Sequence, residues 1–175
     1  MTIKVTDFEN SMAIQGNFDH VIGILDPSMK GHLEERLWKI KNRTMFWFDD
    51  TINTSGGLRP PSESHIADII NLIREKELDS IHKSVLIHCA AGISRSTATA
   101  IGLLIMRGWS VSQAFENVHI MRPQMWPNEL VLKHFDTLLN LDGALIEFDK
   151  TWKRDNLLTG RFWVPFDDKE KENEN

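Results

Sequence analysis

The chain of 175 residues contains no tyrosine and only one cysteine, Cys89. A single cysteine cannot form an internal disulfide, which excludes the disulfide-stapled folds of small secreted proteins. The longest apolar run, 100–106 (AIGLLIM), is far shorter than the roughly 20 residues that a membrane-spanning helix needs. The first ten residues carry two acids and no apolar core, unlike a signal peptide. We therefore expect a cytoplasmic protein with no membrane segment.

Positive charge is also in short supply. The 20 lysines and arginines face 25 acids, a net charge of -5, and the terminal stretch 167–175 (DDKEKENEN) accounts for -3 of it with five acids and two lysines. The rest of the chain is nearly neutral, which predicts no nucleic-acid-binding face. We expect the charged end to be disordered, the aromatic stretch 161–166 (RFWVPF) to pack on the body, and the protein to be a monomer.

Four short apolar runs, each bounded by polar or turn residues, predict β-strands at 3–5, 21–25, 45–48 and 85–88. Apolar residues at helical spacing predict a helix that begins near 61–63, one through 98–105 that Gly108 can close, a short one around 114–118, and one from about 127–128 to Gly143. A further helix is predicted over 33–40. Strands followed by helices indicate an α/β fold. We expect a single domain with a mostly parallel sheet of four to five strands, flanked by helices, and a helix-rich C-terminal half.

The stretch 85–97 (VLIHCAAGISRST) contains the cysteine and has the order strand, loop, helix. A loop between a strand and a helix can direct its backbone N–H groups inward, and the helix N-terminus adds positive potential. Gly92 can adopt the positive φ that a tight loop needs, and the planar fork of Arg95 matches two phosphate oxygens. The stretch therefore predicts a phosphate-binding loop.

The same surroundings would favour the thiolate form of Cys89, which is the nucleophilic form. Ser96 could donate a hydrogen bond to the sulfur, and we expect His88 to orient the loop rather than to transfer protons. The alternative is that Cys89 is an inert residue at the end of a buried strand. The joint spacing of His88, Cys89, Gly92, Arg95 and Ser96 favours the nucleophile.

The sequence HCAAGISRS resembles the signature HCxxGxxR[ST] of the cysteine-dependent protein phosphatases, in particular their dual-specificity branch. The stretch 110–128 (SVSQAFENVHIMRPQMWPN) is similar to the later part of that branch, and HVIGILDP, GLRPPSESHI and HCAAGISRSTATA resemble a bacterial-type group of predicted tyrosine phosphatases. The similarity covers about residues 15–145. It implies a dual-specificity-phosphatase-like catalytic domain over residues 1–148, followed by a C-terminal extension, 149–175.

The resemblance also assigns roles. It makes Cys89 the nucleophile, and neither a metal nor a cofactor is implied; the histidines show no metal-ligand spacing. Asn128 matches a family asparagine that steadies the signature loop, although a helix N-cap explains it as well. The phosphate-binding residues that the resemblance implies are Ala90, Ala91, Gly92, Ile93, Ser94 and Arg95.

A thiolate that attacks a phosphoester needs an acid to protonate the departing oxygen. In the family this acid is an aspartate on a loop upstream of the cysteine. Asp49 and Asp50 directly follow the strand predicted at 45–48, and Asp50, with Thr51 after it, is the better match. The interval from Asp50 to Cys89 is several residues longer than is usual in the dual-specificity branch. A solvated strand end is the alternative explanation for the two acids.

The leading hypothesis is a metal-free phosphatase that acts on phosphotyrosine, with phosphoserine or phosphothreonine as further substrates, through a phosphocysteine intermediate. The expected partner is a phosphoprotein or phosphopeptide. The uncharged loop residues disfavour polyanionic inositol lipids, but another non-protein phosphomonoester stays open. A sulfurtransferase would have a loop of different spacing. The alternative from another class is a phosphoprotein-binding module without turnover, which normally lacks the cysteine, the arginine or the acid.

Overall fold

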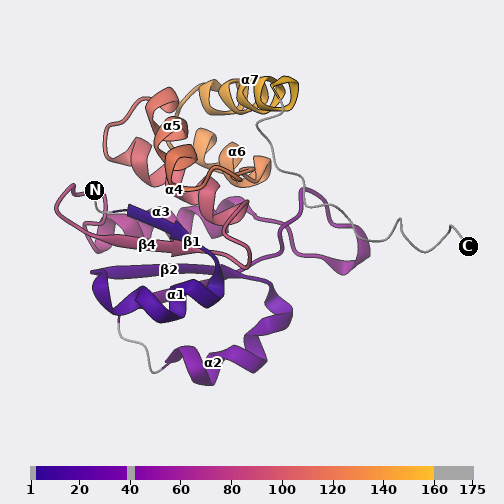
Figure 1. Cartoon of the computed structure of the whole chain (residues 1–175). Coiled ribbons are helices and arrows are strands. Elements are labelled where there is room, and N and C mark those ends of the chain that lie inside the picture. The colour runs from indigo at the N-terminus through magenta and orange to yellow at the C-terminus, as the bar shows by residue number, and fades with distance from the viewer. Residues whose placement is uncertain (1–2, 39–41, 160–175) are drawn as a thin grey trace, which may run out of the picture.

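The computed structural model describes residues 3–38 and 42–159 (Figure 1). The expectations for residues 161–166 and for the charged end 167–175 lie outside the described residues, as does the end of the helix expected over 33–40.

Over residues 3–38 and 42–159, four parallel strands form the sheet. They are β1 (Ile3–Thr6), β2 (His20–Leu25), β3 (Arg43–Trp47) and β4 (Val85–His88), in the spatial order β1-β4-β2-β3. The predicted parallel sheet is confirmed, with one strand shifted: β3 begins and ends earlier than 45–48, because Val21 of β2 pairs with Arg43 and Leu25 with Trp47. The carboxyl ends of all four strands therefore meet at one edge.

In the described residues, seven helices and short 3-10 turns surround this sheet. They are α1 (Phe8–Ile14), α2 (Lys30–Trp38), α3 (Glu63–Glu75), α4 (Arg95–Met106), α5 (Val111–Met121), α6 (Glu129–Leu138) and α7 (Ala144–Leu158), with turns at Pro27–Met29 and Ser55–Gly57 among others. Figure 1 shows α1 and α2 below the sheet, and α3 to α6 above it with α7 outermost.

Each face of the sheet has its own apolar core, because strand side chains alternate between faces. Ile22 and Ile24 of β2 pack in the large core together with α3, α4, α5 and α6. Leu25, which follows them, packs instead with Leu33 and Leu37 of α2. The helix that begins near residue 62 buries its four isoleucines as predicted, capped by Ser62, whose hydroxyl accepts from the His65 amide. These are Ile66, Ile69, Ile70 and Ile73.

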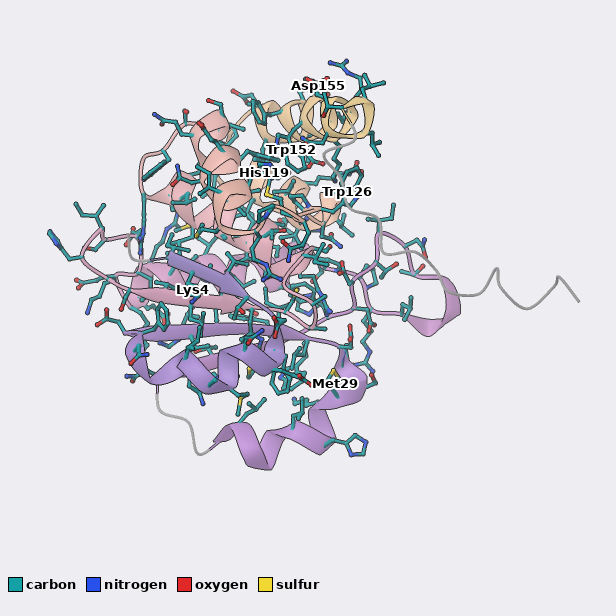
Figure 2. All side chains as sticks on the ribbon, in the orientation of Figure 1. Lys4, Met29, His119, Trp126, Trp152 and Asp155 are labelled. Carbon is teal, nitrogen blue, oxygen red and sulfur yellow. The ribbon has the colours of Figure 1, made fainter. Side chains whose placement is uncertain are left out.

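The C-terminal helices differ from the sequence expectation. The helix that begins at Glu129 ends at Leu138 rather than near Gly143, because Asp136 accepts hydrogen bonds from the amides of Gly143 (2.7 Å) and Leu145 (2.8 Å) and so fixes a turn. The unexpected α7 starts after this turn and includes residue 148, where the catalytic domain was expected to end. Its residue Trp152 packs against the ring of His119 in α5, 5.5 Å between centroids (Figure 2).

Within the described ranges 3–38 and 42–159, no helix combines the length and the apolar character needed to cross a membrane.

Candidate active site

The loop that contains the cysteine joins β4 to α4 at the carboxyl edge of the sheet. The strand β4 has neighbours on both sides, β1 and β2, so the loop leaves the middle of the sheet. In open α/β sheets the ligand site lies at this edge, beyond the carboxyl ends of the strands. The predicted order of strand, loop and helix is therefore present, and α4 begins at Arg95.

The Cys89 side chain lies at the bottom of this loop and is 1% exposed. Its Sγ is 3.2 Å from the backbone N of Gly92, which donates to it, and 3.2 Å from Oγ of Ser96. Gly92 has φ +70°, and a Cβ there would lie 2.6 Å from the carbonyl carbon of Thr6. Only glycine fits a positive φ with the backbone of β1 so close.

Five consecutive carbonyl oxygens of the loop accept hydrogen bonds from other parts of the chain. The pairs are Phe8 N to Ala90 O (3.1 Å), Arg122 Nη2 to Ala91 O (2.9 Å), Arg122 Nε to Gly92 O (3.0 Å), Trp126 N to Ile93 O (2.9 Å) and Asn128 N to Ser94 O (3.3 Å). The donors come from the start of α1 and from the segment between α5 and α6. The loop carbonyls are thereby all held by the surrounding protein.

The amides of the same loop are in the opposite situation. Within the described part of the chain, the backbone N–H groups of Ala91, Ile93 and Ser94 donate to no protein acceptor. Ala91 is exposed, but Ile93 and Ser94 are partly buried, and partly buried amides normally have a partner. A concave set of free N–H groups beside a helix N-terminus is an anion-binding arrangement.

Arg95 is 2% exposed and held from one side. Its Nη1 donates to the carbonyl oxygen of Phe48 (2.6 Å) and to Oδ1 of Asp26 (2.9 Å). Its Nε is buried and makes no hydrogen bond. The guanidinium is therefore oriented by Phe48 and Asp26 while a donor remains available for an oxyanion.

Asp26 was missed by sequence reasoning, which used the Asp-Pro pair only as the end of a strand. The signal that could have indicated it is its position: it directly follows β2, the neighbour of β4, so the parallel order brings it to the edge that carries the loop.

The two adjacent aspartates have different contacts. Oδ1 of Asp50 accepts hydrogen bonds from Oγ of Ser94 (2.6 Å) and Nδ2 of Asn128 (2.8 Å), and its Oδ2 is 3.9 Å from Nε of Arg95. Asp49 instead bonds to Arg59 through both its backbone N (2.8 Å) and its Oδ2 (2.6 Å). The carboxylate of Asp50 therefore contacts the loop that contains Cys89. The carboxylate of Asp49 instead connects the two ends of the segment from Asp49 to Arg59.

Asn128 makes both sets of contacts that the sequence left open. Its Oδ1 accepts from the amides of Leu130 and Val131, each at 3.1 Å, as a helix N-cap does. Its Nδ2 donates to Asp50, and its backbone N donates to the loop. One side chain therefore connects the start of α6 to the candidate acid.

His88 is fully buried behind the loop. Burial and the nearby guanidinium of Arg43 lower its pKa to about 3, so the imidazole is neutral near pH 7. A neutral, enclosed imidazole agrees with a role in orienting the loop.

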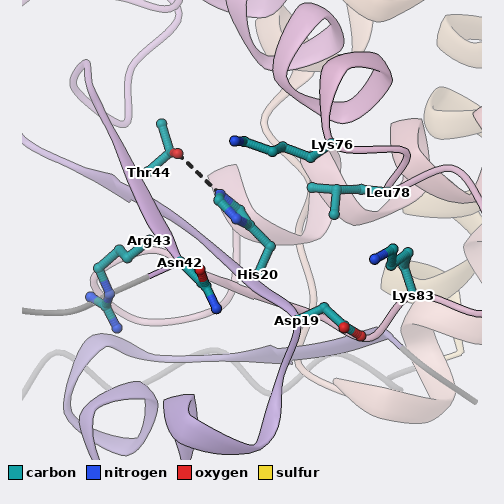
Figure 3. Close-up of a pocket in the computed structure, with 8 residues that line it drawn as sticks. All are labelled: Asp19, His20, Asn42, Arg43, Thr44, Lys76, Leu78 and Lys83. Carbon is teal, nitrogen blue, oxygen red and sulfur yellow. Dashed lines mark hydrogen bonds between the residues drawn. The ribbon is translucent and has the colours of Figure 1, made fainter.

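One hollow lies near the site and another lies at the far end of the sheet. One, of about 340 Å³, adjoins the candidate acid and is lined by Pro27, Ser28, Asp49, Gly57, Leu58 and Arg59. The other, of about 480 Å³, lies at the opposite edge, where β2 and β3 begin, and includes His20, Thr44, Lys76 and Lys83 (Figure 3). In the described ranges, no three His, Cys, Asp or Glu side chains are grouped as they would be to hold a metal ion.

Comparison with known proteins gives the family. The family described as "Dual specificity phosphatase, catalytic domain" matches residues 15–143, most of the chain. The chain belongs to the dual-specificity phosphatase family. This confirms the resemblance carried by the signature loop.

Curated relatives of this phosphatase domain agree. It is 31% identical over 118 residues to human dual specificity protein phosphatase 16, a match that covers 63% of this chain and 16% of the relative. It is 42% identical over 65 residues to dual specificity protein phosphatase Mpk3 of Drosophila melanogaster, covering 37% of this chain and 15% of the relative. The chain thus spans only about a sixth of the length of these relatives.

Solved structures support the fold of the phosphatase domain. The PTP-2 phosphatase of Cydia pomonella aligns with a TM-score of 0.55 at 22% identity, over 78% of this chain and 85% of that one. The human tyrosine phosphatase-like serine/threonine/tyrosine-interacting protein aligns with a TM-score of 0.56 at 18% identity, over 79% and 88%. The predicted single-domain α/β fold is confirmed.

Proposed function

We propose that this domain hydrolyses phosphomonoesters of proteins through a phosphocysteine intermediate. The Cys89 thiolate attacks phosphorus as the bond to the leaving oxygen breaks, and Asp50 gives that oxygen its proton. In the second step Asp50 takes a proton from water, the water oxygen attacks phosphorus, and the phosphorus–sulfur bond breaks. Ser96, 3.2 Å from the sulfur, stabilises the departing thiolate.

The observation that carries this proposal is the hydrogen bonding of the loop. Its carbonyl oxygens from Ala90 to Ser94 all accept hydrogen bonds from other parts of the chain. Backbone N–H groups of the loop and Nε of Arg95 make no hydrogen bond and are free to donate to a phosphate. Donors fixed before the substrate arrives stabilise the negative oxygens of the transition state without reorganising. The sulfur of Cys89 lies within the same loop.

A binding module without turnover fits less well, because such modules normally lack the cysteine, the arginine or the acid. Here Cys89, Arg95 and Asp50 are all present. The sulfur of Cys89 accepts from the Gly92 amide and lies within hydrogen-bond distance of the Ser96 hydroxyl, each at 3.2 Å, and Asp50 contacts both the loop and Arg95. For the same reason we favour hydrolysis over capture. We propose phosphotyrosine as the main substrate class, with phosphoserine or phosphothreonine as further substrates.

The remaining expectations about the cell are also proposals. A catalytic thiolate requires a reducing environment, which supports a cytoplasmic location. We also propose that the protein is a monomer. Its nearly neutral body favours phosphoproteins over nucleic acid or an anionic membrane surface as partners.

The decisive experiment compares the unmodified protein with Cys89→Ser on p-nitrophenyl phosphate and on matched phosphotyrosine and phosphothreonine peptides. We expect turnover by the unmodified protein, inhibition by vanadate, and a phosphorylated Cys89 peptide after acid quench. Cys89→Ser should lose turnover and still bind the phosphopeptide. A Cys89→Ser protein that retains turnover would refute the mechanism, and tight phosphopeptide binding by the unmodified protein without hydrolysis would favour the binding module.

A further inference from the structure

Arg43, at the start of β3, is a partly buried cation with no carboxylate beside it. Within the described part of the chain, no acid lies within ion-pair distance of its guanidinium. All its partners are neutral acceptors: Gln15 Oε1 (2.7 Å), His88 Nε2 (3.1 Å), Ser11 Oγ (3.4 Å) and Met45 Sδ (4.0 Å). Its Nε is buried without a partner. Burying a charge without a counter-charge is costly, so this arrangement calls for an explanation.

The guanidinium reaches His88 across a neighbouring strand. Arg43 is on β3, His88 is on β4, and β2 lies between them. The residue of β2 at this place is Gly23, which pairs with His88 on one side and Met45 on the other. A Cβ on Gly23 would lie 2.6 Å from His88 Nε2, so the missing side chain leaves the space for this contact.

Arg43 lines the hollow at the amino-terminal end of the sheet, but its guanidinium does not point into it. Figure 3 shows its guanidinium directed away from His20, Lys76 and Thr44. It extends instead along the face covered by α1, where Ser11 of α1 and Gln15, directly after this helix, contribute acceptors.

These contacts allow only one protonation state of His88. A guanidinium can only donate, so Nε2 of His88 must be the acceptor and carries no proton. Nδ1 lies 3.4 Å from the carbonyl oxygen of Cys89, which can only accept. The imidazole is therefore neutral with its proton on Nδ1, directed at the backbone of the cysteine.

We propose that Arg43 is a positioning residue for the catalytic thiol: it locks His88 in the Nδ1–H tautomer and supplies an unpaired positive charge that stabilises the Cys89 thiolate. The second part rests on the proposed function, since it assumes that the thiolate is the reactive form. The thiolate and the bound phosphoryl group are then the counter-charge that Arg43 lacks.

Other charged groups face this region from every side, and the effect of Arg43 adds to theirs. The carboxylate of Asp7, the N-cap of α1, only partly opposes burial and Arg43, which lower the pKa of His88. Hydrogen bonds from Asn10, and the charge of Arg122 after α5, lower the pKa of Asp7 itself. Three further charges adjoin the loop: Arg95 on α4, Asp26 after β2 and Asp50 after β3. Burial lowers the pKa of Arg43 itself only to about 10. Arg43 is therefore positively charged at pH 6, where the alkylation rate is measured.

The first test measures thiolate reactivity without turnover. The rate of Cys89 alkylation by iodoacetamide at pH 6 is compared among the unmodified protein, Arg43→Met, which keeps the length, and Arg43→Lys, which keeps the charge. We expect Arg43→Met to react about tenfold more slowly, as for loss of one charge at a separation of roughly 5–10 Å across strands. Arg43→Lys should recover most of the rate.

The matched control is Arg107→Met. Arg107 is also partly buried, but it lies at the far end of α4 and donates to the carbonyl oxygens of Leu78 and Lys83. Its removal should leave the alkylation rate unchanged. Thermal melts of all variants establish that the compared proteins are folded.

The second test observes the tautomer directly. Nitrogen-15 shifts of the His88 ring should show a protonated Nδ1 and an accepting Nε2 in the unmodified protein, and a shift toward the Nε2–H tautomer in Arg43→Met. Gly23→Ala, which blocks the path but keeps Arg43, should have the same effect. An unchanged tautomer or an unchanged alkylation rate in folded Arg43→Met overturns the proposal, as does a loss that Arg43→Lys fails to recover. Because neither readout needs turnover, this outcome is separate from the test of the phosphatase mechanism by Cys89→Ser.

Discussion

Replacing Asp50 by asparagine isolates the proton that the proposed acid supplies. The amide oxygen of asparagine can still accept from Ser94 and Asn128, which now bond to Oδ1 at 2.6 and 2.8 Å. The loop position should therefore survive, and the change removes the acid with little else. A positioned general acid contributes about 10²- to 10⁴-fold to rate, which corresponds to roughly 3–5 kcal/mol of transition-state stabilisation.

That loss should depend on the leaving group. An alkoxide or an unsubstituted phenoxide needs the proton, so Asp50→Asn should lower kcat/KM by the full factor on phosphothreonine peptides and phenyl phosphate. For aryl phosphates whose leaving phenols are strongly acidic, about tenfold or less is expected, because the leaving oxygen departs without help. The assay is a plot of log kcat/KM against leaving-group acidity, which should become steeper in the variant. The ratio kcat/KM is used because it reports cleavage of the leaving group and not the later hydrolysis, in which Asp50 is the proposed base.

Asp49→Asn is the matched control. Oδ2 of Asp49 accepts from the Arg59 amide at 2.6 Å. The variant therefore weakens one charge-assisted hydrogen bond, worth about 1–3 kcal/mol, at the base of the segment from Asp49 to Arg59. Any loss of activity should then be the same for good and poor leaving groups. Equal losses across the series for Asp50→Asn, or a steeper plot for Asp49→Asn, would refute the assignment of Asp50.

Three further changes test the site and its support. Gly92→Ala should abolish most activity and cost roughly 1–3 kcal/mol in thermal unfolding, because φ is +70° and the new Cβ meets the backbone of Thr6 at 2.6 Å; an active, equally stable variant would contradict this. Asn128→Asp should keep the N-cap and the melting temperature but lower kcat, because its carboxylate replaces the donor to Asp50; unchanged kinetics would show that only the cap matters. Burial and Arg43 lower the pKa of His88 from 6.5 to about 3. Between these two pH values the unfolded chain binds a proton at His88 that the folded protein does not bind. The contribution of neutral His88 to the free energy of unfolding is therefore complete above pH 6.5 and falls by about 1.4 kcal/mol per pH unit below it. Urea unfolding at pH 7.5 and 5.5 should show this loss in the unmodified protein and less of it in His88→Gln; equal losses would count against it.

The elements that the sequence predicted well are those whose signal is local. The strand 85–88 is a continuous apolar run with turn residues after it, and the helix from Glu63 carries four isoleucines on one face. The helix α7 gave no such signal, since its first half follows directly on a polar turn. It is held by contacts of Trp152 with α5, much earlier in the chain, and it begins after the turn that Asp136 fixes.

The site divides in the same way. Cys89, Gly92 and Arg95 lie within seven residues of one another, so their spacing predicted their common site. The groups that orient them come from far along the chain: Asp26 is 69 residues from Arg95, and Arg43 is 45 from His88. A parallel sheet brings the ends of distant strands together, and only the strand order reveals which ones meet.

The contacts also separate the site into a fixed half and a half that can move. The loop from Ala90 to Ser94 is held at every carbonyl by α1 and by the segment before α6, so its donors are set by folding and binding a phosphate need not rearrange them. The segment that follows β3 is held differently: Asp49 and Arg59 close its base, and its tip carries Gly56 and Gly57 at positive φ. A closed base with glycines at the tip lets the span between them change conformation without disturbing β3. Asp50 begins that span and contacts the fixed half only through side chains. For the proposed mechanism, such a span would let Asp50 protonate the leaving oxygen and then take a proton from water, while the loop that holds the phosphate stays in place.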